Sequence, residues 1–228
     1  MLSDAEIAVV LLSLRVAAWS VALSLVPGIL IGWLLARWEH PLRAILQALV
    51  MLPLVLPPVV TGYLLLELFG RSAPLGRLWN AATGGAIAYT TGACVLAAAV
   101  VGFPLMVESI RLAILGVDRR LELISRSLGR GPLSTFIRVT LPLASTGVLA
   151  GAVVGFARSL GEFGATIVLA GNIEGETRTI PVAVYTLLNM PGGESAVLRL
   201  VAVSVGLSIV ALLGAYGLTR RAERARGR

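Results

Sequence analysis

The sequence contains no lysine, one histidine (His40) and one cysteine (Cys94) among its 228 residues. A Walker A phosphate-binding loop and a Schiff base both require a lysine, so the composition excludes both chemistries. A zinc site built from cysteine and histidine, or an intrachain disulfide, needs more of these residues than the chain provides. We therefore expect no metal site and no ATP hydrolysis by a Walker A loop in this chain.

Charged residues are also scarce, at 14% of the chain, whereas hydrophobic residues make up 57%. Soluble domains usually contain about 45–50% apolar residues, so the composition indicates an integral membrane protein. About 20 apolar residues cross a bilayer core as a helix. Five uncharged stretches approach or exceed this length: 16–36, 44–66, 78–107, 139–157 and 200–219. A sixth stretch, 179–193, is short and contains Pro181 and Pro191, which predicts a re-entrant or surface helix.

All 19 basic residues are arginine, and their distribution predicts the orientation in the membrane. With five spans and segment 116–141 placed in the cytoplasm, 13 arginines fall inside and 4 outside, while Arg15 and Arg158 lie at or within spans. This bias fits the positive-inside rule. The N-terminus is therefore predicted outside and the C-terminus in the cytoplasm, with residues 1–228 forming a single membrane domain. Because the first residues are acidic, we expect no cleavable signal peptide.

Segment 116–141 joins two predicted spans and is rich in arginine. Asp118 can cap a short helix. Leu121, Ile124 and Leu128 follow at helical spacing and share one face. Gly129 can then end the helix in the left-handed conformation.

A second short helix is predicted to follow, because Pro132 suits a first helical turn. Leu133, Phe136 and Ile137 continue an apolar face at helical spacing. The result is a helix–turn–helix on the cytoplasmic surface whose apolar ridge can fill a groove on a partner protein. The alternative is an amphipathic loop that rests on lipid headgroups.

Gly129 is followed by nine residues and then by Val-Thr-Leu-Pro at 139–142. This spacing resembles the cytoplasmic loop of ABC importer permeases, whose pattern is Glu-Ala-Ala, three residues, Gly, nine residues and Ile-x-Leu-Pro. Here the Glu-Ala-Ala positions hold Leu-Ile-Ser at 123–125, and the glutamate comes one residue early. The resemblance implies a loop that couples the chain to a separate ATPase through Asp118, Glu122, Ser125, Leu128, Gly129, Leu133 and Phe136.

Other segments extend the resemblance from the first helix to the fifth span and narrow it to the permeases of molybdate ABC importers. They are Leu-Pro-Leu-Val-Leu-Pro-Pro-Val-Val-Thr-Gly-Tyr at 52–63, Arg-Ser-Leu-Gly-Glu-Phe-Gly-Ala-Thr at 158–166, Gly-Asn-Ile at 171–173, Thr-Arg-Thr-Ile-Pro at 177–181 and Pro-Gly-Gly-Glu at 191–194. Tungstate and sulfate permeases are the nearest alternatives.

The resemblance implies an all-α type I importer permease with five core spans, a possible short sixth helix and cytoplasmic coupling helices. The expected partners are a second copy of the chain, two cytoplasmic ATPase subunits and an external molybdate-binding protein. The chain itself would bind no cofactor, because MgATP belongs to the ATPase, and no nucleic acid. We expect it in the cytoplasmic membrane of a bacterium or archaeon.

Arg158 and Glu162 are ionisable residues in or near a span, where charged residues are costly and commonly functional. They are four positions apart, so they can pair on one side of a helix. One interpretation is that the pair shapes an outer gate or an anion path, with hydroxyl donors from Thr61, Ser159 and Thr166. The alternative is a structural ion pair that fixes helix packing.

The outer segment 171–194 is long and polar at its start, which is typical of functional loops. It is predicted to be a lid or a contact for the binding protein, through Glu174, Glu176, Arg178 and Glu194. Two other classes need different features: an intramembrane enzyme needs a catalytic constellation, and an ion channel needs a selectivity loop. The sequence indicates neither.

Overall fold

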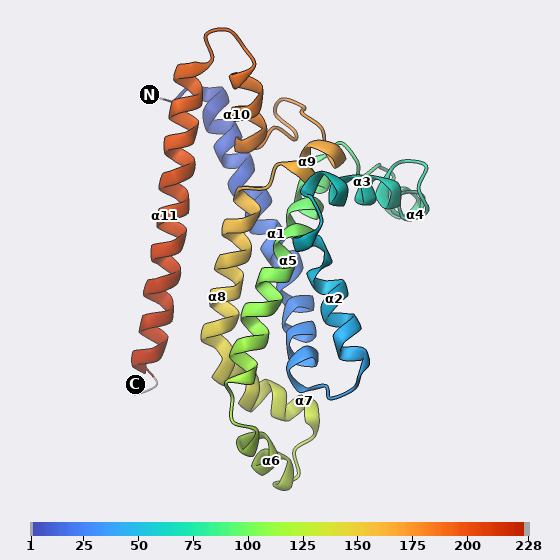
Figure 1. Ribbon diagram of the computed structural model, residues 1–228, viewed down its shortest axis with the longest axis vertical. Coiled ribbons are helices and arrows are strands. Elements are labelled where there is room, and N and C mark those ends of the chain that lie inside the picture. Colours follow the sequence, from blue (N-terminus) through green and yellow to red (C-terminus); the bar gives the residue numbers. More distant parts are fainter. Residues whose placement is uncertain (1, 226–228) are drawn as a thin grey trace.

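The computed structural model describes residues 2–225, and all regular structure in that range is helical (Figure 1). Within it, four segments are long and apolar enough to cross a membrane. They are α1 (Asp4–Arg37), α5 (Thr91–Leu115), the segment Pro132–Leu160 that ends in α8 (Leu141–Leu160), and the first part of α11 (Glu194–Ala225). The bent pair α2 (Leu42–Val55) and α3 (Pro58–Phe69) supplies a possible fifth span.

The centre of the bundle is the contact between α1, α5 and α8. Glycines on α8 allow a close approach: a Cβ added to Gly155 would lie 2.7 Å from Met106 Cε, and one added to Gly151 would lie 3.0 Å from the Met106 carbonyl oxygen. Small residues at such contacts let membrane helices pack by van der Waals contact. A capping box begins α1: the Ser3 side chain accepts a hydrogen bond from the Glu6 backbone N–H, and the Glu6 side chain accepts one from the Ser3 backbone N–H.

The predicted second span, 44–66, contains Pro53, Pro57 and Pro58, which predict a bent helix, and the structure shows it broken into two helices. Pro57 and Pro58 have no backbone N–H to continue the hydrogen bonds of α2, and Leu56 before them is extended (φ −68°, ψ 143°). The chain therefore turns by 112° between α2 and α3. The absence of charged residues predicted an apolar segment correctly, but it does not predict in which direction each part of the segment runs.

The predicted third span, 78–107, began too early. Residues 78–83 belong to α4 (Pro74–Thr83), which ends at Gly84 in the left-handed conformation (φ +75°). The span α5 begins only at Thr91 and continues to Leu115, past Glu108 and Arg111. These two residues pair at 2.6 Å within one helical turn, so the charges do not end the helix.

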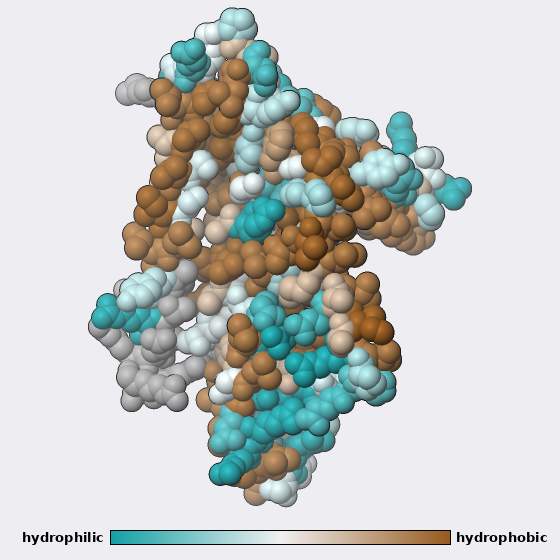
Figure 2. Space-filling view, viewed as in Figure 1, coloured by the Kyte–Doolittle hydropathy of each residue, from teal (hydrophilic) through white to brown (hydrophobic). Residues whose placement is uncertain are grey.

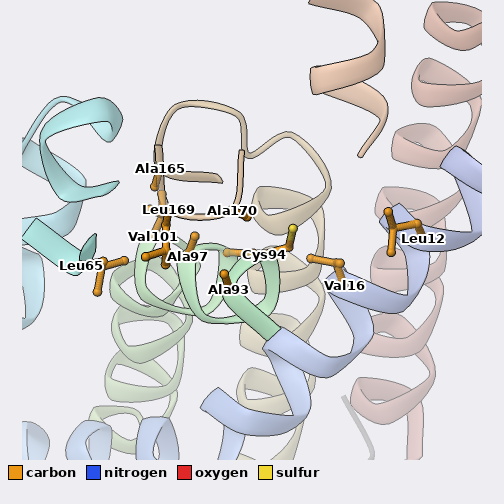
Figure 3. Packing of buried hydrophobic residues seen from close by; sticks show 11 residues of the cluster. Leu12, Val16, Leu65, Ala93, Cys94, Ala97, Val101, Ala165, Leu169 and Ala170 are labelled. Atoms are coloured by element: carbon orange, nitrogen blue, oxygen red, sulfur yellow. The ribbon is translucent and has the colours of Figure 1, made fainter. Parts of the chain in front are cut away.

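Two short helices lie near the N-terminal end of the molecule. The predicted short sixth helix is present as α10 (Ile180–Leu188), which packs against α11 and α1. The helix α9 (Gly164–Leu169) was not anticipated. Its Ala165 and Leu169 join a buried cluster with Ala93 and Ala97 of α5 (Figure 3).

The segment that joins α5 to α8 lies at the opposite end of the molecule from α10 and the N-terminus (Figure 1). It consists of α6 (Arg119–Ser127), α7 (Pro132–Thr135) and a π-helical turn (Phe136–Thr140) that runs directly into α8. This arrangement agrees with the prediction that 116–141 and 171–194 face opposite sides of the membrane. Arg226 and Arg228, which contributed to the predicted orientation, lie outside the described residues.

Candidate functional site

Segment 116–141, which is predicted to couple the chain to an ATPase and is called the coupling segment below, has the local structure that its sequence signals predict. Asp118 caps α6, because its side chain accepts a hydrogen bond from the Arg120 backbone N–H at 2.9 Å. Gly129 has φ +84°, the left-handed conformation predicted for the end of this helix. Pro132 occupies the first turn of α7. The predicted helix–turn–helix is confirmed.

An apolar ridge on this segment is exposed in the isolated chain. Leu128 is the most open of its residues, with 77% of its surface exposed. Exposed apolar side chains that no described part of the chain covers are typical of a docking surface. The ridge consists of Leu121, Ile124, Leu128, Leu133 and Ile137.

Two residues predicted to contribute to the coupling surface are instead buried. Phe136 is only 7% exposed, and its ring lies 5.3 Å from that of Trp33 in α1. Phe136 begins the π-helical turn and packs against α1, so it is not part of the exposed face that carries Leu133. Ser125 is buried as well, with its Oγ 3.1 Å from Thr135 Oγ1. These residues hold α6, α7 and α1 together, so any effect on a partner is indirect.

Glu122 lies at the centre of a hydrogen-bond network that connects three elements. Its Oε1 accepts hydrogen bonds from Arg37 Nη2 at 2.9 Å and from Thr140 Oγ1 at 2.7 Å. Arg37 Nη2 also donates to the Val117 carbonyl oxygen at 3.0 Å. The end of α1, the coupling helix α6 and the beginning of α8 are thereby joined at one carboxylate. Arg37 had been interpreted only as a charge that sets orientation, because no local pattern indicates a partner so distant in sequence.

A second ion pair supports the same segment at its surface. Arg119 Nη1 donates a hydrogen bond to Glu39 Oε1 in the loop after α1. This hydrogen bond, together with the charge of Arg119, lowers the pKa of Glu39 below its ordinary value of 4.5. Both side chains are largely exposed, so solvent screens their attraction.

At the other end of α8, Arg158 and Glu162 form the predicted ion pair, with Arg158 Nη2 2.9 Å from Glu162 Oε2. The two residues do not share a helical face, because α8 ends at Leu160 and Glu162 lies in the break before α9. Glu162 is 3% exposed, and its Oε1 accepts a hydrogen bond from the Ala165 backbone N–H at 2.9 Å. The carboxylate therefore pairs with α8 and caps α9 at the same time.

The predicted hydroxyl donors around this break are buried within the chain. Ser159 Oγ lies 2.8 Å from Ser20 Oγ in α1 and donates to the Ala98 carbonyl oxygen at 3.3 Å, so it joins three helices. Thr166 is buried in α9. Thr61 is buried in α3, and its Oγ1 has no hydrogen-bond partner within the described residues.

The two helices that carry Thr61 and Thr166 are in close contact. A Cβ added to Gly62 would lie 2.7 Å from Ala165 Cα, and one added to Gly164 would lie 2.7 Å from Pro58 Cβ. The structure thus brings α3, α9 and the break containing Glu162 together. A path for an ion through these residues remains a prediction.

The outer segment carries the predicted binding-protein contacts, but they are not one cluster. Arg178 pairs with Glu174 at 3.1 Å and donates from Nε to Asn172 Oδ1 at 2.7 Å. Glu176 Oε1 accepts from the Thr91 backbone N–H at 3.1 Å, so it connects the loop to α5. Glu194 begins α11, where it is exposed.

A hollow of about 350 Å³ lies at this end of the molecule, between the beginning of α1, α10 and α11. Its lining includes the ion pair between Glu6 and Arg199, whose Oε1 and Nη2 atoms are 2.8 Å apart. The sequence does not predict this pairing, because the two partners are separated by nearly the whole chain.

Residues 28–224 match the sequence profile of the binding-protein-dependent transport system inner membrane component family. The match covers most of the chain, and the protein belongs to this family. It is thus a membrane component of a transport system.

Several relatives in the family carry a specific name. The chain is 49% identical over 227 residues to the molybdenum transport system permease protein ModB of Escherichia coli K12, covering 100% of this chain and 99% of that protein. It is 44% identical over 222 residues to the ModB protein of Haemophilus influenzae, covering 97% of each chain. It is also 43% identical to the ModB protein of Mycobacterium tuberculosis, covering 92% of this chain and 78% of that one.

Solved structures confirm the fold. A chain of the MetNI methionine ABC transporter, solved in inward-facing conformations, aligns with a TM-score of 0.73 at 16% identity, covering 97% of this chain and 99% of that one. A chain of a bacterial alginate ABC transporter aligns with a TM-score of 0.74 at 16% identity, covering 96% and 80%. The predicted all-α fold of type I ABC importer permeases is therefore confirmed.

Proposed function

We propose that this chain is the permease of a molybdate ABC importer. The observation that carries the proposal is the 49% identity to a ModB protein along the full length of both chains. Relatives named for molybdenum transport also occur at 44% and 43% identity. The protein would provide the membrane path, and a separate ATPase would bind and hydrolyse MgATP.

The working assembly is a homodimer with two ATPase subunits on the cytoplasmic side and a molybdate-binding protein outside. A single copy has a closely packed centre built from α1, α5 and α8, so a path for an ion is more easily formed between two symmetric copies. The N-terminus and the 171–194 segment would face outside, and α6, α7 and the C-terminus would face the cytoplasm. This orientation is supported by the arginine distribution and by the opposite placement of the two segments (Figure 1).

Movement of the ATPase would enter through the exposed ridge on α6 and α7. It would then pass to α1 through Arg37 and to α8 through Thr140, because both hydrogen-bond to Glu122. Ser159 connects the far end of α8 to α1 and α5, so these helices would move together as a rigid unit. At that far end, the Arg158–Glu162 pair joins α8 to α9, where the outer gate would open and close.

The anion should bind weakly to this chain, because a transport path must release its ion. Backbone N–H groups at helix breaks and buried hydroxyls are suitable donors for a tetrahedral oxyanion. Thr61 is the strongest candidate, since its buried hydroxyl has no hydrogen-bond partner within the described residues. High affinity for molybdate would reside in the binding protein.

The decisive experiment is ion uptake by proteoliposomes that contain this chain, its ATPase and its binding protein. We expect ATP-dependent uptake of molybdate in preference to sulfate. Uptake of sulfate or tungstate in preference to molybdate would keep the importer class and change the substrate. Uptake that does not depend on ATP would overturn the importer assignment and favour a channel.

A further inference from the structure

The helix α4 extends away from the bundle beside α3, and the two form a lateral arm over residues 58–83 (Figure 1). Its geometry is fixed at the junction. Gly76 of α4 lies so close to the carbonyl oxygen of Gly70 that an added Cβ would collide with it. One side of α4 is thus held against the end of α3, and its remaining sides are open.

The open surface of α4 is amphipathic. At 100° per residue, Leu75, Leu78, Trp79 and Ala82 fall within one stripe about 100° wide, whereas Arg77 and Asn80 lie on the opposite side. All the stripe residues are exposed, and Leu78 has 68% of its surface accessible. An apolar stripe that no part of the described chain covers requires an apolar environment outside the chain.

The arm also has a defined position relative to the spans. It lies toward the end of the bundle that carries α9 and α10, because the chain turns by 112° at the end of α2 (Figure 1). Figure 2 shows the lower side of the arm, toward the middle of the spans, as apolar, and its outer side as polar. The apolar face of α4 therefore points toward the level of the bilayer hydrocarbon, and its polar face points toward the level of the water.

We propose that α4 is an interfacial helix that lies in the headgroup layer of the outer leaflet. Leu75, Leu78 and Ala82 would enter the acyl region, and Trp79 would lie at the boundary, where tryptophan is enriched. Arg77 and the neighbouring exposed Arg71 would face the lipid phosphates, to which their charge is complementary. A phospholipid surface is favoured over a protein partner because it is apolar on one side and both anionic and hydrated on the other.

This inference goes beyond the proposed transport function. Anchored in this way, α4 would hold the end of α3, and with it the contact between α3 and α9, at a fixed depth in the membrane. The other helices in the outer half of the molecule would then move relative to the fixed α3–α4 arm.

The test places a nitroxide label on each face of α4 in the full chain, reconstituted in phosphatidylethanolamine and phosphatidylglycerol vesicles. Cys94 is fully buried, so Cys94→Ala gives a background for single-cysteine variants. Leu78→Cys reports the apolar face, and Asn80→Cys, on the opposite polar side of the helix and also exposed, is the matched control. We expect the ratio of oxygen to nickel-chelate accessibility to be severalfold higher at position 78 than at position 80.

Two results would overturn the proposal. Equal nickel accessibility at both positions would place the arm in water. Protection of position 78 from both reagents would show that a second copy or another protein covers it. The measurement needs neither ATPase nor molybdate, so its outcome is independent of the transport assignment.

A second measurement avoids cysteine substitution altogether. Lipids brominated near the headgroup should quench the tryptophan fluorescence of the native chain, and Trp79→Phe should remove a distinct part of that quenching. An unchanged quenched fraction in Trp79→Phe would also contradict the interfacial position.

Discussion

Arg37, at the end of α1, donates two hydrogen bonds to Glu122 in α6, from Nε at 3.2 Å and from Nη2 at 2.9 Å. The two residues are separated by 85 positions, and both side chains are mostly buried. The glutamate comes one residue earlier than the family pattern places it, and here it faces its own chain. Its role in this protein is therefore to position the coupling segment, whatever the partner contacts directly.

Glu122→Ala should destabilise the coupling segment and uncouple transport. The substitution removes all three hydrogen bonds that Glu122 accepts, two from Arg37 and one from Thr140, and leaves Arg37 without its carboxylate. We expect a cost of about 1.5–3 kcal/mol. We expect a lower melting temperature for the purified chain, and ATP hydrolysis that the loaded binding protein no longer stimulates. Glu39→Gln is the matched control, because Glu39 also pairs with an arginine of α6 but is exposed. Equal changes in melting temperature and in ATPase stimulation for the two variants would contradict the role of Glu122 in positioning the coupling segment.

Leu128→Asp should prevent the ATPase from binding while leaving the chain itself stable. Leu128 is largely exposed at the tip of the ridge and supports little within its own chain. A charge there would have to be desolvated in an apolar groove of the partner, which is unfavourable. The expected result is loss of copurification with the ATPase at an unchanged melting temperature.

Phe136→Asp provides the contrast, because Phe136 is buried against Trp33. It should lower the melting temperature as well as binding. If Leu128→Asp still copurifies with an ATPase that responds to the loaded binding protein, the ridge is not the docking surface.

Lowering the pH should remove the contribution of Glu39 to stability only in the acid range. The pKa of Glu39 is lowered in the folded chain by Arg119, so its ion pair stabilises the fold above the ordinary pKa of 4.5. The contribution is lost as pH falls through the folded pKa. The difference in melting temperature between the wild type and Glu39→Gln should therefore be small and constant from neutral pH down to about 5, and should vanish in stronger acid. A difference that changes near neutral pH would point to another titrating group.

The features that the sequence predicted correctly depend on neighbours in the chain. A capping aspartate, a glycine with positive φ and a proline in a first helical turn act within a few residues, so Asp118, Gly129 and Pro132 were placed correctly. The apolar character of the spans is similarly local. Family resemblance supplied the class of transporter, and this was confirmed by the full-length relatives.

The sequence patterns did not predict two kinds of feature: the direction in which a helix runs, and contacts between residues that are far apart in the chain. The prolines of the second span predict a bend, but they do not give its size, which is 112° between α2 and α3. The arm helix α4 was hidden because its last residues are as uncharged as the span that follows. The partners of Glu122, Ser159 and Glu6 come from other helices, and periodicity along one helix contains no information about them.

The Arg158–Glu162 pair gives a prediction that separates a structural role from a role in the ion path. Glu162 is buried, pairs with Arg158 and caps α9, so Glu162→Leu leaves an arginine unpaired in a membrane protein and should cost about 3–5 kcal/mol. Replacing both residues, Arg158→Met with Glu162→Leu, removes the unpaired charge. Replacing a buried ion pair by apolar residues is often close to neutral.

If the pair is structural, the double variant should recover both melting temperature and ATP-dependent uptake relative to Glu162→Leu alone. The recovery should be incomplete, because the cap on the Ala165 N–H is still missing, at a cost of about 1 kcal/mol. Glu162→Gln is a useful companion, since its amide oxygen can keep that cap while removing the charge. Recovery of melting temperature without recovery of uptake would instead assign the charges to the ion path, because stability and transport would then depend on different properties of the same two residues.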